Sequence, residues 1–493
     1  MSHIFMKGSG KKVKKCPVAA ATICTLIGIF TCGCSTSDIC VTYQNETQSG
    51  VQNEIQTETQ SEAQIETIES QTQEGSMPEK TVQEEQVQEN PTQVATEEPR
   101  SSAEQAQFFS KELFGRSTEE TNPVESPVSA YLAMALAGQG AKGDTAAEFD
   151  AVMGSERQAL SEQFMKTLPA QAEGTKVALA NSAWLDDRLT CNDDWVKAAK
   201  DSYLAEVYQT RLSTGKTMGK INAWVEKNTQ GLIKELLEEP LDDMTRVALF
   251  NTVYFKGKWQ SAFDGGATAK EPFTLADGSQ VQVDMMRKTG NFCYVQGVTG
   301  ETGISDSGLS DDGATGTEKA YEGIVLDYRD SDLLFVALMP TEGHTVRELY
   351  ENLTFSELGE QIDAAKGAAN PRVDLWLPKF EVSFDRILNP DLAGMGLASA
   401  FDPDRADFTG IGTAEGENLH ISLVRQKAVF IVDEEGTEAA AVTEVIMRAN
   451  GIMLVEEPRV VHFDKPFLYL VFDPQTDMPL FVGIMDDPGL AQK

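Results

Sequence analysis

The stretch EEGTEAAAVTEV, residues 434–445, has the pattern of a segment that can become a β-strand without being obliged to form one. From Thr437 onward, the residues at even numbers include the charged Glu438, Glu444 and Arg448, whereas those at odd numbers are uncharged as far as Ala449. Successive side chains of a strand point to opposite faces, so one face can be buried while the other stays in water. Small residues and Gly436 disfavour a permanent strand, so the pattern predicts a segment that inserts into a sheet. The uncharged, mostly small alternate residues are Thr437, Ala439, Ala441, Thr443, Val445, Met447 and Ala449.

Residues 434–441 resemble the hinge of the reactive-centre loop in the serpins, a family of serine protease inhibitors. The resemblance covers residues 101–488 and implies the α+β serpin fold, with about three β-sheets, a helical N-terminal part and an exposed reactive-centre loop. Other motifs similar to those of the family occur in the expected order; they are SPVS at 126–129, GAKGDT at 140–145, NSAWL at 181–185, INAWV at 221–225, NTVYFKGKW at 251–259, LPKF at 377–380, VHFDKPFL at 461–468 and PLFVG at 479–483.

The resemblance implies an irreversible suicide-substrate inhibitor of serine proteases rather than an enzyme. In such serpins a protease cleaves the loop and is trapped as a covalent acyl-enzyme when the hinge inserts into the large sheet, a recognised case of strand addition. A charge at the first inserting residue, Thr437, would cost several kcal/mol on burial. The uncharged inward residues of the hinge favour inhibition over the alternative, a non-inhibitory binding protein on a serpin scaffold. The implied hinge residues are Glu434, Gly436, Thr437, Ala439, Ala440 and Ala441.

The resemblance also places the reactive-site bond. Counting about fourteen residues from the hinge glycine gives Asn450, with Gly451 following. The stretch from residue 434 to 466 is several residues longer than in many relatives, so neighbouring residues remain alternatives. Arg448 would suit a trypsin-like protease, Met447 or Met453 a chymotrypsin-like one, and Ala449 or Val445 an elastase-like one. The apolar surroundings favour elastase- or chymotrypsin-like targets.

A polar cluster is implied beneath the point where the sheet opens. Ser126, Ser129 and Asn251 correspond to that cluster in the family, and Gln426 occupies the position of its usual histidine. Glutamine also donates and accepts hydrogen bonds, so the network can survive without a titrating group. Trp259 corresponds to a residue near the top of the sheet where insertion begins, although a tryptophan taken alone is more often explained by ordinary core packing.

The N-terminus has the pattern of a secretory signal. Five lysines within residues 7–15 precede an apolar run at 18–30, which is short for a membrane span. The sequence TCGC at 31–34 resembles a bacterial lipoprotein cleavage site, with Cys34 as the lipidated residue and residues 1–34 as the signal peptide. An uncleaved anchor and simple secretion are the alternatives.

Residues 35–100 are rich in Gln, Glu and Thr and have few apolar residues, which predicts a disordered linker. The linker would join the lipid anchor to a serpin domain at 101–488. The expected location is therefore extracellular, on the surface of a bacterial cell, with membrane contact only through the lipid. A low-complexity tail without a role is the alternative for the linker.

The composition excludes several other classes. The formal net charge of −36 argues against nucleic acid. The four histidines have no metal-ligand spacing, and neither HExxH nor GxSxG occurs, so no metal, cofactor or catalytic residue is expected. Cys191 and Cys293 are expected as two thiols, with a single disulfide as the alternative. We expect a monomer.

The hydrophobic pattern predicts helices early and strands late, an α+β arrangement. Helices are expected at 103–114, 127–136 and 221–237, and strands at 247–255, 373–377, 428–432, 467–472 and 480–484. Residues 297–316 are rich in Gly, Ser, Thr and Asp and are expected as an inserted surface loop, with a recognition loop as the alternative.

Overall fold

The structure is a computed structural model that describes residues 100–297, 320–416, 418–437 and 457–491. All of them belong to the compact unit that begins at Ala95. Within these ranges, no helix has the length and apolar character needed to span a bilayer. The expected insertion at 297–316 and the expected signal and linker lie almost wholly outside the described residues.

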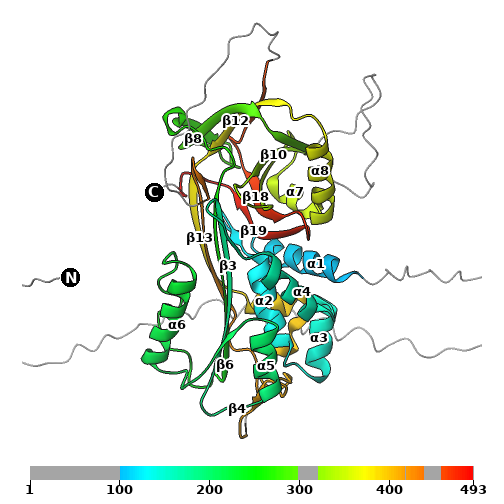
Figure 1. Ribbon diagram of the computed structural model, residues 1–493, viewed down its shortest axis with the longest axis vertical. Helices are drawn as coiled ribbons and strands as arrows, with labels where there is room; N and C mark the ends of the chain where they lie inside the picture. Colours follow the sequence, from blue (N-terminus) through cyan, green and yellow to red (C-terminus); the bar gives the residue numbers. More distant parts are fainter. Residues whose placement is uncertain (1–99, 298–319, 417, 438–456, 492–493) are drawn as a thin grey trace, which may run out of the picture. The chain divides into compact units, whose positions relative to one another are not determined.

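The helices begin where the sequence supplies caps (Figure 1). Ser101 caps α1 and Thr354 caps α8, each with a glutamate three residues later that bonds back to the cap. The helices are α1 (Ser102–Gly115), α2 (Pro127–Gly138), α3 (Gly143–Met153), α4 (Arg157–Thr167), α5 (Asp193–Asp201), α6 (Gly215–Asn228), α7 (Val346–Asn352), α8 (Phe355–Gly367) and α9 (Asn389–Leu392).

Two of the three predicted helices are confirmed, and the third is displaced, because α6 begins at Gly215 and not at 221. α6 ends at Asn228, not 237, because Gln230 and Gly231 have φ values of +53° and +85°. Ile233 is still buried, but beyond the helix. The helical spacing of 103–114 predicts Phe108, Phe109, Leu113 and Phe114 on one apolar face of α1. Phe108 is the exception, because it lies exposed with the Arg100 guanidinium 4.1 Å from its ring centroid.

The large sheet is built on β6 (Val247–Lys258), which pairs antiparallel along its whole length with β3 (Thr175–Leu185). β2 (Ala170–Gln171) and β5 (Glu206–Gln209) flank β3. β13 (Phe380–Ile387) and β15 (Arg425–Val432) form a separate antiparallel pair. No ladder joins β15 to β6 within the described ranges. The large sheet is therefore divided between these two strands.

Two further sheets complete the fold, so the expectation of about three sheets is confirmed. The six-stranded sheet has the order β1 (Val124–Glu125), β19 (Met478–Met485), β18 (Phe467–Asp473), β11 (Leu334–Pro340), β10 (Tyr321–Asp327) and β9 (Cys293–Gly297). The four-stranded sheet has the order β17 (Arg459–His462), β12 (Arg372–Pro378), β8 (Gln280–Asn291) and β7 (Ala269–Thr274). β4 (Thr190–Cys191) pairs with β14 (Gly412–Thr413). All five predicted strands are confirmed.

The two faces of β6 meet different helices. Even-numbered residues such as Phe250 pack in one hydrophobic cluster with Trp224 of α6. The odd-numbered Asn251 is bonded to Ser129 of α2 instead. Figure 1 shows α6 on one side of the long strands and α2 on the other.

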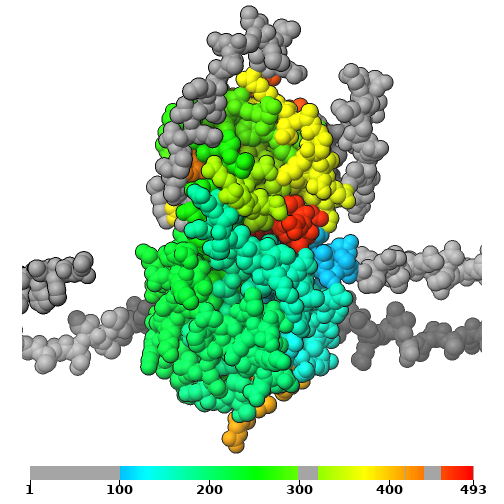
Figure 2. Space-filling model, in the orientation of Figure 1, coloured from blue at the N-terminus to red at the C-terminus, as the bar shows by residue number. Residues whose placement is uncertain are grey.

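In Figure 2 the C-terminal residues, in red, reach the surface between the early helices and the yellow α8. Cys191 and Cys293 are free thiols, as expected.

Candidate functional site

The start of the predicted hinge pairs with the Lys258 end of β6. Gly436 and Thr437 form a two-residue strand, β16 (Gly436–Thr437), opposite Lys258 and Gly257. The Thr437 side chain faces inward, is only 2% exposed, and lies 2.8 Å from the hydroxyl of fully buried Tyr328. The segment therefore enters the divided sheet by its first two residues.

Close backbone contact explains the glycine of the hinge. A Cβ atom on Gly436 would lie 2.0 Å from the Gly257 carbonyl oxygen and 2.7 Å from the Cα atom of Lys258. On the other strand, a Cβ atom on Gly257 would lie 2.4 Å from the Tyr328 ring. Glycine on both strands lets their backbones approach at the point of entry.

Trp259 holds the turn that leads into the hinge. Its indole N–H donates to the Asp433 carbonyl at 2.9 Å, and its backbone N–H donates to the Glu435 carbonyl at 2.8 Å. The indole is 1% exposed and stacks on Tyr328, with ring centroids 5.0 Å apart. The tryptophan thus combines core packing with direct contact to the hinge.

Carboxylates shape the same turn. The Asp433 carboxylate accepts from the backbone N–H groups of Glu435 and Gly436 at 2.9 and 3.2 Å. Burial raises the pKa of Asp433 although these hydrogen bonds oppose the shift. The Glu434 carboxylate lies 2.6 Å from the Lys379 ammonium group and accepts from Thr268 at 2.8 Å.

The electrostatics of Glu434 favour the ion pair. Burial has the largest single effect on the pKa of Glu434 and raises it, but the hydrogen bonds from Lys379, from the residue's own backbone and from Thr268, together with the charge of Lys379, outweigh burial, so the pKa is lowered. The sequence reasoning missed the roles of Asp433, Thr268, Tyr328 and Lys379. Of these four residues, only Lys379 could have been found from the sequence, because it lies within the LPKF motif at 377–380.

The predicted polar cluster consists of two networks. In the first, the Ser126 backbone N–H donates to the Gln426 side chain at 3.0 Å, and the Gln426 amide donates back to the Ser126 carbonyl at 2.9 Å. The Ser126 hydroxyl donates to the Leu480 carbonyl at 2.7 Å. Gln426 of β15 is thereby fastened to the residue between β1 and α2.

The second network joins α2 to β6 and β3. The Ser129 hydroxyl donates to the Asn251 side chain, and the Asn251 amide donates to the Asn181 side chain at 2.7 Å. Asn181 in turn donates to the Tyr203 carbonyl at 2.7 Å. A long contact of 3.4 Å from the Ser129 N–H to the Ser126 hydroxyl connects the two networks. Asn181 was missed, although it lies in the NSAWL motif.

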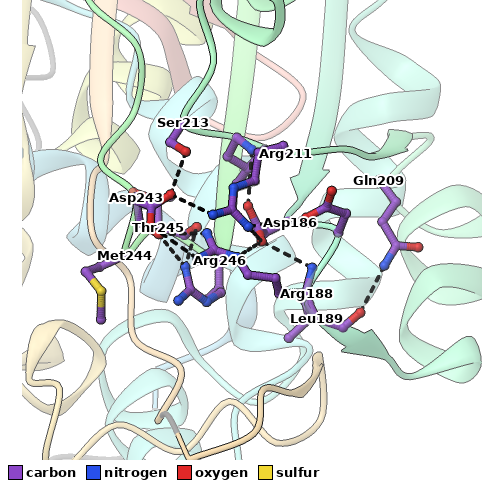
Figure 3. A network of polar contacts seen from close by, with 12 residues as sticks. Asp186, Arg188, Leu189, Gln209, Arg211, Ser213, Asp243, Met244, Thr245 and Arg246 are labelled. Atoms are coloured by element: carbon purple, nitrogen blue, oxygen red, sulfur yellow. Dashed lines mark hydrogen bonds and ion pairs between the residues drawn. The ribbon is translucent and has the colours of Figure 1, made fainter.

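A third network fastens the Val247 end of β6 (Figure 3). Asp186 follows β3, is fully buried, and accepts hydrogen bonds from the Arg188 side chain and from the Leu212 N–H. The backbone N–H of Asp186 donates to the Arg246 carbonyl at 2.8 Å. Arg211 and Ser213 bind Asp243, just before β6, at 3.0 and 2.7 Å. Sequence reasoning did not identify this network.

Several of the predicted site residues lie outside the described ranges. Within those ranges, no group of His, Cys, Asp and Glu is arranged to hold a metal ion. In the described part of the site, backbone pairing and polar side-chain contacts hold the two residues of β16 beside β6 at the edge of the large sheet. The undescribed residues are Ala439, Ala440, Ala441, Met447, Arg448, Ala449, Asn450, Gly451, Met453 and Cys34.

Comparison with known proteins agrees with this architecture. The family model described as "Serpin (serine protease inhibitor)" matches residues 104–488. Alpha-1-antiproteinase S of Cavia porcellus is 31% identical over 392 residues, which cover 77% of this chain and 89% of that protein. The native-state structure of the thermophilic serpin tengpin is 29% identical, with a TM-score of 0.67, and the match covers 80% of this chain and 96% of that one.

One structural neighbour is known as a ligand complex. Human thyroxine-binding globulin with its bound hormone is 24% identical, with a TM-score of 0.64, over 78% of this chain and 98% of that one. At this identity the likeness shows the fold alone. The match of the family model to residues 104–488 and the 31% identity with alpha-1-antiproteinase S show that the chain belongs to the serpin family.

Proposed function

We propose that this serpin is an irreversible suicide-substrate inhibitor of serine proteases, with elastase- or chymotrypsin-like enzymes as the favoured targets. The observation that carries the proposal is the pairing of Gly436 and Thr437 with β6 beside a divided sheet. The strand has begun to form, and the sequence beyond it offers uncharged residues at each inward position as far as Ala449.

The proposed reaction begins as ordinary proteolysis. The serine hydroxyl of the protease attacks the carbonyl carbon of Asn450, the peptide bond to Gly451 breaks, and the hydroxyl proton leaves with the new amine. An ester then joins the two proteins. The freed hinge continues from β16 along β6 and carries the protease with it before water can hydrolyse the ester. New backbone hydrogen bonds and buried surface drive this step.

The direct test uses the full chain. It is mixed separately with pancreatic elastase, chymotrypsin and trypsin, and each mixture is analysed on a denaturing gel. A band at the summed mass with one of these proteases supports covalent trapping, and mass spectrometry of the released C-terminal peptide identifies the bond. Loop cleavage that leaves every protease active contradicts inhibition of these classes.

The second candidate is a non-inhibitory binding protein. It is favoured only by the similarity in fold to thyroxine-binding globulin, which shows that this fold can hold a ligand in another protein. The uncharged residues at the inward positions of the hinge argue for inhibition instead. A chain that is cleaved without gaining thermal stability would support the binding protein.

We also propose that the inhibitor is a monomer on the outer surface of a bacterial cell. The basic and apolar pattern of residues 1–34 and the TCGC sequence support lipidation of Cys34, with residues 35–100 as the linker to a domain at 101–488. In cells, Cys34→Ala should move the chain from the detergent phase to the aqueous phase. A wild-type chain already in the aqueous phase contradicts the anchor.

A further inference from the structure

The outer face of the four-stranded sheet carries a row of side chains that crosses three strands. His462 of β17, Trp376 of β12 and Arg287 of β8 lie opposite one another in the two ladders. Residues that are opposite in a ladder present their side chains to the same face of the sheet. The Trp376 and His462 ring centroids are 5.1 Å apart, and the Arg287 guanidinium lies 4.3 Å from the Trp376 ring centroid. The row is therefore a continuous surface of two rings and a cation.

The neighbouring row of the same face contains an exposed valine. Val460 of β17 lies opposite Asp374 of β12, which lies opposite Thr289 of β8. Val460 is 59% exposed, although valine is ordinarily a buried residue. Val461 and Leu375, which point to the other face of the sheet, are fully buried. The sheet thus has one face in the core and an outer face that is open to solvent at Val460.

Asp374 fixes the arginine and the tryptophan of this outer face. Its carboxylate accepts from Nε and Nη2 of Arg287 at 3.0 and 2.7 Å, and from the Thr289 hydroxyl at 2.9 Å. The Trp376 indole N–H donates to the same carboxylate at 3.3 Å. The hydrogen bonds, with that from Arg287 first, outweigh burial and lower the pKa of Asp374, so the carboxylate stays ionised. The two large side chains are therefore ordered before a partner arrives, which reduces the entropy lost on binding.

The chemistry of the outer face differs from that of the whole chain, whose formal net charge is −36. The Arg287 side chain is 47% exposed, and its Nη1 group has no hydrogen-bond partner among the described residues. Acids near the face include Glu271, whose charge acts on Arg287, and Asp464, which lies 3.6 Å from His462. Tryptophan and arginine are enriched among the residues that dominate protein–protein binding. The face therefore suits a protein that presents an acidic side chain beside an apolar patch.

The position of the outer face along the chain indicates which protein this is. Asn450, the expected cleavage position, and Val460 are ten residues apart, so they lie within about 36 Å of each other. A protein of about 240 residues has a diameter of roughly 45 Å, so a protease seated at Asn450 extends over distances of this order. The face also lies near the hinge, because Lys288 of β8 donates to Ser261, just beyond the Lys258 end of β6. Figure 1 shows β8 and β12 at the end of the molecule opposite β4.

We propose that His462, Trp376, Arg287 and Val460 form a second contact surface for the serine protease that binds the loop, and that this surface meets an acidic side chain of the protease. The identity of the partner rests on the proposed function. The contact forms before the loop is cut, so it raises the rate at which the protease and the loop associate. It gives the chain a means to select among proteases that accept the same loop sequence.

The test measures the second-order rate constant for loss of the intact full chain in excess protease. The protease is whichever of pancreatic elastase, chymotrypsin and trypsin cuts the loop, as mass spectrometry of the released peptide determines. Val460→Glu should lower the rate constant about tenfold, because like charges oppose docking, whereas Val460→Lys should leave it within about twofold of wild type or raise it. This difference should shrink in about 1 M salt.

Met244 provides the matched control for a change of net charge. It is 63% exposed, as a surface valine such as Val460 is, and lies just before the Val247 end of β6, at the opposite end of that strand from Ser261. Met244→Glu alters the net charge as Val460→Glu does, and it should leave the rate constant within about twofold of wild type.

A second variant removes the aromatic contact and adds no charge. Trp376→Leu keeps an apolar side chain in β12 but removes the ring that stacks on Arg287 and the indole N–H that binds Asp374. It should lower the rate constant about fivefold, because a large, rigid contact residue is lost. Thermal unfolding of each variant without protease shows whether the fold is intact, and the Val460 variants test the surface even if Trp376→Leu is destabilised.

The outcomes separate this proposal from the proposed function. Equal rate constants in wild type, Val460→Glu and Trp376→Leu overturn the contact surface, whether or not a covalent band forms. Equal slowing by Val460→Glu and Met244→Glu also overturns it, since net charge alone would explain the loss, and slowing by both Val460 variants contradicts an acidic partner. The expected pattern of rates without a covalent band supports the surface and contradicts inhibition. A loop that none of the three proteases cuts contradicts both proposals.

Discussion

The Thr437 hydroxyl lies 2.8 Å from the Tyr328 hydroxyl, and both side chains are buried where the hinge meets β6. Tyr328 also stacks on Trp259, whose indole holds the carbonyl of Asp433. Thr437, the first residue expected to insert, therefore makes a buried polar contact with Tyr328 among apolar side chains. Burial raises the pKa of the Tyr328 hydroxyl far above its usual value, so this contact stays neutral at physiological pH.

If the proposed function is correct, Thr437→Arg should convert this serpin from an inhibitor into a substrate. A guanidinium opposite Gly257 would have to enter the apolar layer around Tyr328, and an unpaired buried charge costs several kcal/mol. The loop should still be cleaved, but the covalent band on a denaturing gel should disappear and protease activity should survive. Thr437→Ser keeps the hydroxyl and should still trap the protease. Arginine at 437 with wild-type stoichiometry of inhibition would show that this residue does not need to enter the sheet.

Gly436→Ala should loosen the hinge from β6. The added methyl group would lie 2.0 Å from the Gly257 carbonyl oxygen, so the strands must separate. We expect the thermal midpoint of the intact protein to fall, and amide exchange at Trp259, whose N–H donates to the Glu435 carbonyl, to become faster. Gly215→Ala is the control, because a Cβ atom there meets nothing within 4 Å. Unchanged exchange in Gly436→Ala would contradict the importance of the close backbone contact.

Much of the fold could be predicted from the sequence because its signals are local. The strand at 247–255 is an apolar run, and the family-like motifs give the order of the elements. The end of α6 could not be predicted, because the hydrophobic pattern continues to Ile233 while the backbone turns at Gln230 and Gly231. Phe108 was misplaced because helical spacing alone does not show which aromatic lies at the boundary with solvent.

The polar parts of the site were harder to predict than its strands. The role of Gly436 and Thr437 could be predicted, because the alternation of uncharged and charged residues that marks the inserting segment is visible in one stretch of the sequence. The partners of the hinge come from distant segments, since Thr268, Tyr328 and Lys379 meet Glu434 and Thr437 only in the folded chain. Asp186 and Asp243 look like ordinary surface acids in sequence, yet Asp186 is fully buried among arginines.

Gln426→Ala should destabilise the intact protein. The glutamine satisfies both the N–H and the carbonyl of Ser126 in a buried position, and its removal would leave both groups without that partner. Each unsatisfied buried group costs about 1–3 kcal/mol. Urea unfolding should show a loss of about 2–5 kcal/mol. The exposed Gln230→Ala is the control and should change stability little. A loss below about 1 kcal/mol would mean that water replaces the amide.

Glu125→Gln should stabilise the native state at neutral pH. Glu125 is fully buried beside Ser126, and its carboxyl faces Arg386, whose guanidinium is 3.7 Å away. Burial raises the pKa of Glu125 to about 8, although the Ser117 hydroxyl and Arg386 favour the charged form and Asp391 and Glu120 oppose it. The folded state therefore keeps a proton on this carboxyl that the unfolded chain releases near its ordinary pKa.

The sign of the pH dependence follows from these proton counts. Between about pH 4.5 and 8 the folded state binds more protons at Glu125 than the unfolded state, so this residue's contribution to stability falls as pH rises. The loss amounts to at most about 5 kcal/mol. In urea titrations at pH 5 and pH 8, Glu125→Gln should flatten the difference that wild type shows. The exposed Glu239→Gln should leave that difference unchanged. If Glu125→Gln is as pH-dependent as wild type, the buried carboxyl is ionised in both states and another group controls the pH dependence of stability.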